Sequence, residues 1–166
     1  MTPRDVVTGY FAALGRHDTS AAVEFLDPEV VDEISSVGVL RGREEVRNFF
    51  DGLFKAAPDL ELTVDRTVRE RDTVAVQWRM QGTFNGAGPL FNGIQPTGAE
   101  LRMRGCDVLE VRDELIVTNM AFQDGLELAR GLGMMPPQDS PAERAMIGAF
   151  NTATKVRAAV RDRFGQ

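Results

Sequence analysis

The chain has 166 residues, of which 43% are hydrophobic and 27% charged, a size that suits one domain with a substantial buried core. Its formal net charge is −6 and its arginines are scattered, which argues against a nucleic-acid partner or an anionic membrane surface. The single cysteine, Cys106, excludes an intrachain disulfide and a cysteine-based zinc site. We recognise no secretory leader and no apolar run of about 18 residues, so we expect a cytoplasmic protein without a membrane span.

Residues 2–18 predict the first helix. Thr2 is a suitable N-cap, Pro3 suits the first helical position, and Asp5 lies three residues after the cap, as in a capping box. Apolar residues then recur at helical spacing, which indicates one buried face.

Two more helices and a strand follow. A short helix is predicted over residues 19–26, ending there because the residue before Pro28 disfavours the helical region. Residues 29–35 predict a strand. Residues 43–57 predict an aromatic-rich helix that ends at Pro58.

The second half of the chain predicts four strands, at residues 60–68, 73–84, 100–111 and 115–123. The glycine- and proline-rich connection between the second and third of these is typical of a lid or a long hairpin loop. After the last strand, Asp124 and Glu127 form a capping box that begins a helix over residues 124–133. Helices first and antiparallel strands afterwards predict an α+β domain with helices on one face of the sheet.

Asp107 lies on the apolar face of its strand. The alternation of residues 100–111 places it beside Met103 and Leu109, and a lone ionised carboxylate is costly in such a core. Asp107 is therefore a candidate functional residue. Two other interpretations remain open: a hydrogen bond to Asn119 across the hairpin, or an outward position paired with an arginine in the other register.

Four segments carry a family resemblance: YFAALGRHD, GIQPTG, GCDVLEVRDELI and FQDGLELARGLG. They resemble the SnoaL-like polyketide cyclase family, within the superfamily that includes ketosteroid isomerase and nuclear transport factor 2. The resemblance covers residues 1–135, which we expect to form one domain, with residues 136–166 as a C-terminal helical extension. It implies a cone-shaped, curved antiparallel sheet wrapped around N-terminal helices, a deep apolar pocket and a homodimer.

The isomerase branch of the resemblance implies a catalytic set of three side chains. Tyr10 matches the tyrosine of the first helix, and Asp107 matches an acid on a later strand. The base matches either Asp32 or Glu33: alternation along the strand favours an inward Asp32, whereas counting along the isomerase pattern favours Glu33. Both residues stay candidates.

This set suits proton transfer next to a carbonyl. A neutral acid in an apolar site and a tyrosine hydroxyl can donate hydrogen bonds to a developing enolate, while an ionised carboxylate removes the α proton. We expect the substrate to contact Phe11, Phe50, Phe54, Trp78, Met80, Met103, Asn119 and Ala121.

The resemblance therefore implies a cyclase or isomerase that needs no metal or cofactor and acts on an apolar, polyketide-like carbonyl compound. Two departures weaken a direct transfer of the family's mechanisms. Ala121 stands where many cyclases and epoxide hydrolases have an essential aspartate, and the acid–base histidine of the cyclases is matched by Asp107. Ala121 favours a second hypothesis, a non-catalytic binder of a hydrophobic small molecule, and a protein-interaction module is a third.

The tail predicts a long helix after Pro136 and Pro137. Ser140 is a suitable N-cap, with Pro141 at the first helical position and Glu143 closing a capping box. About 24 residues at 1.5 Å each extend over ~36 Å. An apolar stripe follows the helix at steps of three or four: Met146, Phe150, Ala153, Val156, Val160 and Phe164. We expect this stripe to cover the outer face of the sheet or to reach a partner subunit, with packing on its own domain as the alternative.

Overall fold

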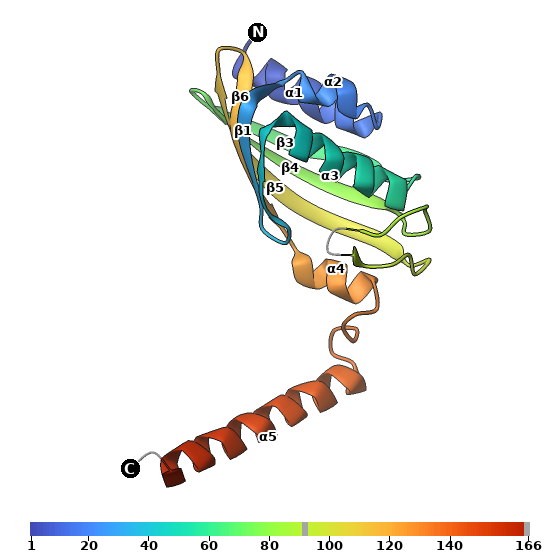
Figure 1. Cartoon of the computed structure of the whole chain (residues 1–166), viewed down its shortest axis with the longest axis vertical. Coiled ribbons are helices and arrows are strands. Elements are labelled where there is room, and N and C mark those ends of the chain that lie inside the picture. The colour runs from blue at the N-terminus through green and yellow to red at the C-terminus, as the bar shows by residue number, and fades with distance from the viewer. Residues whose placement is uncertain (91–92, 165–166) are drawn as a thin grey trace.

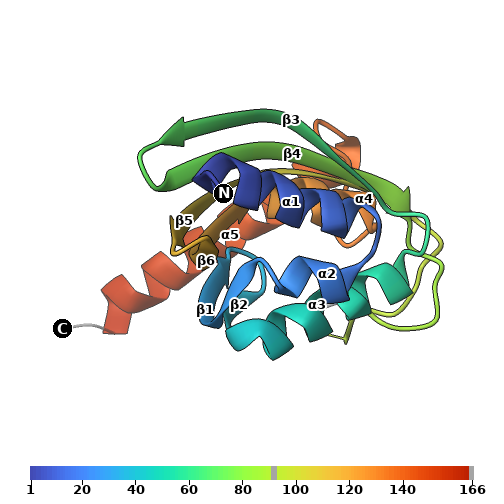
Figure 2. The same ribbon diagram turned by 90° about the horizontal axis from the view of Figure 1, so that it is seen from above.

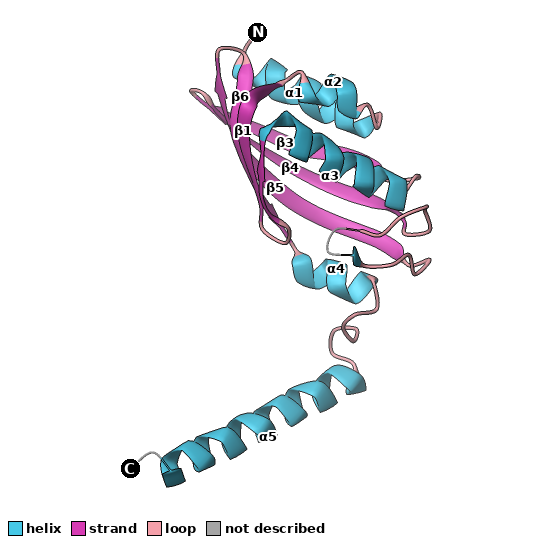
Figure 3. Ribbon diagram, viewed as in Figure 1, coloured by secondary structure: helices cyan, strands magenta, loops and turns pink. Residues whose placement is uncertain are grey.

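The computed structural model describes residues 1–90 and 93–164, the last three by their backbone alone, so the side chain of Phe164 lies outside the described part. The helices are α1 (Pro3–Gly15), α2 (Thr19–Val23), α3 (Gly42–Ala56), α4 (Gly125–Gly131) and α5 (Pro141–Phe164). The strands are β1 (Leu26–Ile34), β2 (Gly38–Arg41), β3 (Glu61–Glu70), β4 (Thr73–Thr83), β5 (Glu100–Arg112) and β6 (Leu115–Gln123). Figures 1 and 3 show these elements.

The six strands form one curved, open sheet in the order β2-β1-β6-β5-β4-β3. Helices α1, α2 and α3 lie on its concave face, as Figures 1 and 2 show. The predicted α+β class and the sheet wrapped around N-terminal helices are confirmed. One detail differs: β1 pairs in parallel with β6, so the sheet is mixed, although its other neighbours are antiparallel. Strand β6 follows β1 only after β2, α3 and three further strands, and this long crossover permits parallel pairing.

Local sequence signals set several element boundaries. In the capping box of α1, the backbone N–H of Asp5 donates to Thr2 Oγ1 at 3.3 Å and that of Thr2 donates to Asp5 Oδ2 at 2.9 Å. The second helix is shorter than predicted, and β1 begins already at Leu26. Pro28 is tolerated in β1 because the pairing with β6 is irregular between Leu26 and Val31, where no ladder donor is needed. The sequence analysis missed β2.

The core lies between the concave face and the helices. Alternate residues of β4 and β5 face it, among them Val74, Val76, Leu101 and Leu109, each at most 1% exposed. Leu128 and Leu132, within and just after α4, are also buried, so α4 closes one end of the sheet.

Helices α4 and α5 both lack the predicted capping box. Each N-cap side chain accepts as expected: Asp124 from the N–H of Glu127 at 3.0 Å, and Ser140 from that of Glu143 at 3.1 Å. The two glutamates bind elsewhere, because Glu127 pairs with Arg104 and the carboxylate of Glu143 accepts from the N–H of Asp139. Nearby partners thus replace the reciprocal cap. No helix in the described part of the chain is long and apolar enough to cross a membrane.

Candidate active site

Strand β1 settles which carboxylate faces the interior. Asp32 is 2% exposed and lies on the concave side, between the buried Val30 and Ile34. Glu33 is exposed on the opposite side. The hypothesis that Glu33 supplies the base is therefore wrong, because neighbouring side chains of a strand point to opposite faces.

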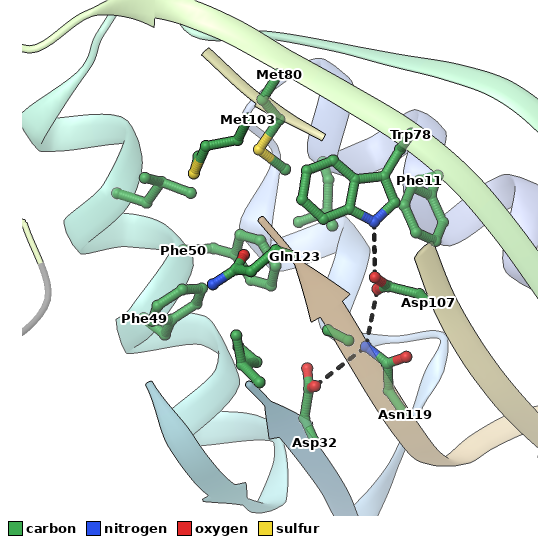
Figure 4. Close-up of a pocket in the computed structure, with 14 residues that line it drawn as sticks. Phe11, Asp32, Phe49, Phe50, Trp78, Met80, Met103, Asp107, Asn119 and Gln123 are labelled. Atoms are coloured by element: carbon green, nitrogen blue, oxygen red, sulfur yellow. Dashed lines mark hydrogen bonds between the residues drawn. The ribbon is translucent and has the colours of Figure 1, made fainter. Parts of the chain in front are cut away.

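Three adjacent strands bring Asp32, Asp107 and Asn119 together. The amide Nδ2 of Asn119 donates to Asp32 Oδ1 at 3.1 Å and to Asp107 Oδ2 at 3.0 Å. From β4, the indole Nε1 of Trp78 donates to Asp107 Oδ1 at 2.6 Å. Figure 4 shows this chain of hydrogen bonds along one wall of a cavity. Of the two other interpretations of Asp107, the hydrogen bond to Asn119 is confirmed and the outward position is wrong.

A glycine creates the space for Trp78. A Cβ added at Gly105, the Cα partner of Trp78 on β5, would lie 2.5 Å from Cζ2 of the indole and 2.5 Å from the carbonyl oxygen of Phe122. Real Cβ atoms do not approach so closely, so only glycine lets the indole lie flat over β5 and reach Asp107.

The cavity beside this network is narrow and mostly apolar. Its volume is about 40 Å³, room for roughly three waters. The lining residues are Phe11, Leu14, Asp32, Ile34, Phe49, Phe50, Leu53, Trp78, Met80, Met103, Asp107, Asn119, Ala121 and Gln123.

Besides Glu33, two predicted site residues do not line the cavity. Phe54 is buried elsewhere, stacked on His17 with 4.0 Å between ring centroids. Tyr10 is 2% exposed and packs edge-on against Phe11, at 5.5 Å between centroids. Five lining residues were not predicted as site residues: Leu14, Ile34, Phe49, Leu53 and Gln123. Phe49 neighbours the predicted Phe50, and alternation from Asn119 and Ala121 would have placed Gln123 inward.

Burial changes the acid–base properties of the two aspartates. It raises the pKa of Asp32 to about 7, helped by the charge of Asp107 and opposed by the hydrogen bond from Asn119. Burial also raises the pKa of Asp107 to about 6, opposed by the hydrogen bonds from Trp78 and Asn119. Two N–H donors thus favour the ionised form of Asp107, whereas one acts on Asp32.

Tyr10 stays neutral. Burial raises its pKa well above 10, and the charges of Asp32 and Asp107 raise it further. The phenol therefore lies close enough to both carboxylates for their charges to raise its pKa, and its hydroxyl group stays protonated.

Asn119 also has an unused acceptor. Its Oδ1 is buried and has no hydrogen-bond partner within the described residues. A buried acceptor without a partner costs free energy, so this oxygen favours a donor from a water or a ligand. Within the same part of the chain, no group of three or more His, Cys, Asp or Glu side chains could hold a metal ion.

Comparison with known proteins gives one family and many similar folds. The SnoaL-like polyketide cyclase family matches residues 4–132 of the chain. No curated protein matches it.

Three solved structures illustrate the likeness. AclR, a putative hydroxylase from Streptomyces galilaeus, is 26% identical with a TM-score of 0.69, covering 81% of this chain and 97% of its own. Wild-type IdmH, a putative polyketide cyclase from Streptomyces antibioticus, is 26% identical with a TM-score of 0.67, covering 80% and 99%. An NTF2-like protein from Burkholderia thailandensis is 27% identical with a TM-score of 0.67, covering 82% and 99%.

Proposed function

The chain belongs to the SnoaL-like polyketide cyclase family, and we propose that it is a cyclase or isomerase that moves a proton next to the carbonyl of an apolar, polyketide-like substrate. The observation that carries this proposal is the pair of buried aspartates joined by Asn119 and bordered by an apolar cavity. Burying two carboxyl groups costs free energy. Buried acids with shifted pKa values beside a cavity are therefore typical of functional sites.

The pair works with one shared proton. With a pKa of about 7 for Asp32 and about 6 for Asp107, the state with one protonated and one ionised carboxyl group is most populated between about pH 6 and pH 7. An ionised carboxylate can remove the α proton, and a neutral carboxylic acid can donate a hydrogen bond to the oxygen on which negative charge develops.

The hydrogen bonds favour Asp107 as the base and Asp32 as the acid. Asp107 accepts from Trp78 and Asn119, and these donors stabilise its charge. Asp32 accepts one hydrogen bond, on Oδ1, which leaves Oδ2 to carry the proton toward the substrate. This assignment reverses the roles that the family resemblance implies for the two acids.

Substrate binding requires the cavity to widen. A volume of about 40 Å³ is far below the several hundred Å³ of usual ligand sites. Phe11 lines both this cavity and a groove of about 370 Å³ beside α1 and β3, whose walls include Val7, Leu62 and Val76. A rotation of the Phe11 ring would join the two spaces, so that the reacting carbonyl enters the cavity and the apolar remainder lies in the groove.

A second candidate function is the binding of a hydrophobic small molecule without chemistry. The observation that favours it is Ala121, which lines the cavity without any reactive group. Under this hypothesis the two aspartates and the free acceptor of Asn119 only anchor the hydroxyl groups of a ligand.

Proton exchange distinguishes the two functions. The protein is incubated in D₂O with 2-tetralone, a small apolar ketone with acidic α protons, and loss of the α-proton signal is followed by NMR. We expect exchange faster than in buffer, and no acceleration by the Asp32→Asn/Asp107→Asn double variant. Saturable binding of the ketone with exchange equal to that of the double variant would favour the binder.

A further inference from the structure

Helix α5 presents an apolar stripe without any cover from its own domain. Phe150 is 67% exposed, Val156 57% and Val160 51%. Figure 1 shows α5 extending away from the sheet and from α1, α2 and α3. An exposed stripe of this length on a 24-residue helix is typical of an interaction surface.

The first turn of α5 is bound to α4 and to the connection between the two helices. Arg130 forms an ion pair with Glu143 at 2.5 Å, with side chains only 21% and 13% exposed, and donates to the carbonyl oxygen of Pro136 at 3.3 Å. The other carboxylate oxygen of Glu143 accepts from the N–H of Asp139 at 2.6 Å. These contacts join the first turn of α5 to α4 and to the connection between them, while the apolar stripe farther along the helix is exposed and available to another molecule.

The outer face of the sheet carries a matching apolar row. Successive Cα partners cross all six strands in the order Val39, Glu33, Met120, Val108, Ala75 and Val68. Val39, Met120 and Val68 are 46%, 45% and 51% exposed, and the adjacent Phe122 is 52% exposed. Phe122 and Cys106 also line a groove of about 420 Å³ on this face.

We propose that α5 of one molecule lies across the outer sheet face of a second copy of this chain. The dimensions agree, because α5 is ~36 Å long and six strands spaced about 4.8 Å apart span roughly 24 Å between the outermost axes. In a two-fold dimer the contact occurs twice, since each copy supplies one helix and one sheet.

The charges agree as well. Glu33 is the one charged member of the apolar row on the sheet. Arg157, four residues after Ala153 and three before Val160, is a cation within the apolar stripe of α5. A dimer that pairs Glu33 with Arg157 leaves neither charge alone in an apolar contact.

Charge exchange tests the pairing in the full-length chain. Sedimentation equilibrium gives the dimer Kd of the wild type, Glu33→Arg, Arg157→Glu and the double variant. We expect each single charge reversal to raise the dimer Kd at least about tenfold, because it places two like charges together in the interface. The double variant restores opposite charges and should recover most of the loss. Single and double variants with the wild-type Kd would overturn the proposal, and so would a wild type that stays monomeric at about 100 μM, where a stable dimer is well populated.

The single native cysteine gives a second, independent readout. Cys106 lies on the outer sheet face beside Phe122, so Phe150→Cys on the stripe should form an intersubunit cross-link with it through a short bismaleimide. Lys155→Cys, on the opposite side of α5, is the matched control and should not. Equal cross-linking of the two variants would overturn the proposed contact, as would α5-dependent binding to phosphatidylserine vesicles by a protein that remains monomeric.

Discussion

The cavity and helix α5 differ in which side chains they bury: the cavity buries polar groups, whereas α5 exposes apolar ones. Beside the cavity, two carboxyl groups, an amide and an indole N–H are buried among phenylalanines and methionines. On α5, Phe150 and Val156 lie in water. Both arrangements oppose the usual preference of polar groups for solvent and of apolar groups for the interior.

The two regions handle this cost differently. The buried polar groups bind one another, so that Asn119 donates to both carboxylates and Trp78 donates to Asp107, and within this network of described residues only the Oδ1 of Asn119 and the Oδ2 of Asp32 accept no hydrogen bond. The apolar stripe of α5 finds no such internal compensation. The difference teaches that one chain supplies the partners for the polar groups of the cavity, whereas the stripe of α5 has none in its own domain and is proposed to bind a second copy.

The largest expected effect is on the chemistry of the cavity. Asp107→Asn removes the proposed base and should lower α-proton exchange of 2-tetralone about 10³-fold. Asparagine has nearly the size of aspartate, but only its amide oxygen can accept from the indole N–H of Trp78, so its side chain must be oriented for that bond. Circular dichroism and ligand binding therefore serve as the control for folding. Activity near the wild-type level in a folded variant would exclude Asp107 as the base.

Phe11→Ala tests whether the Phe11 ring limits the space that a ligand can occupy in the cavity and the groove. Removing a ring that is 5% exposed should destabilise the protein by about 3 kcal/mol in urea unfolding. The same variant should bind larger apolar ketones more tightly than the wild type does, measured by calorimetry at one temperature. Phe54→Ala is the matched control, because it also deletes a buried ring but does not line the cavity. Improved binding in both variants would contradict a special role of Phe11.

The pH dependence of stability tests the buried acids. Because the pKa of Asp32 is about 7 in the folded protein and 3.8 for a solvated aspartate, the folded state holds its proton more tightly than the unfolded state does. Stability from this group is present below about pH 4 and is lost as the pH rises to about 7. The unfolding free energy of the wild type relative to Asp32→Asn should therefore fall by on the order of 2 kcal/mol between about pH 5 and pH 8. A difference that stays constant over this range would show that burial does not raise the pKa of Asp32.

The smallest effect distinguishes the acid from the base. Asp32→Asn keeps a hydrogen-bond donor in the cavity and should reduce proton exchange only about tenfold, whereas Asp32→Leu, which lacks the donor, should lose about 10²-fold. The two rates are compared with that of Asp107→Asn in the same assay. If Asp32→Asn is as inactive as Asp107→Asn, Asp32 is the base and the assignment of roles must be exchanged.

The sequence alone determined the helices and five of the six strands, and it favoured an inward position of Asp107 over an outward one. Each of these depends on local rules: capping at Thr2, termination before Pro58, and the period of two that places Asp107 beside Met103. The family resemblance also supplied the curved sheet, which the structure confirms.

Tertiary structure alone decided how the site is assembled. Alternation along the strand favoured Asp32 over Glu33, but the family pattern favoured Glu33, and only the parallel register that sets Asp32 beside Asn119 decided between them. No local pattern predicts a pairing between residues 87 positions apart. The assignment of the two acids depended on Trp78, whose indole reaches Asp107 only because Gly105 carries no side chain. Likewise, the apolar stripe of α5 was recognised in the sequence, but only the tertiary structure shows that its own domain leaves the stripe exposed.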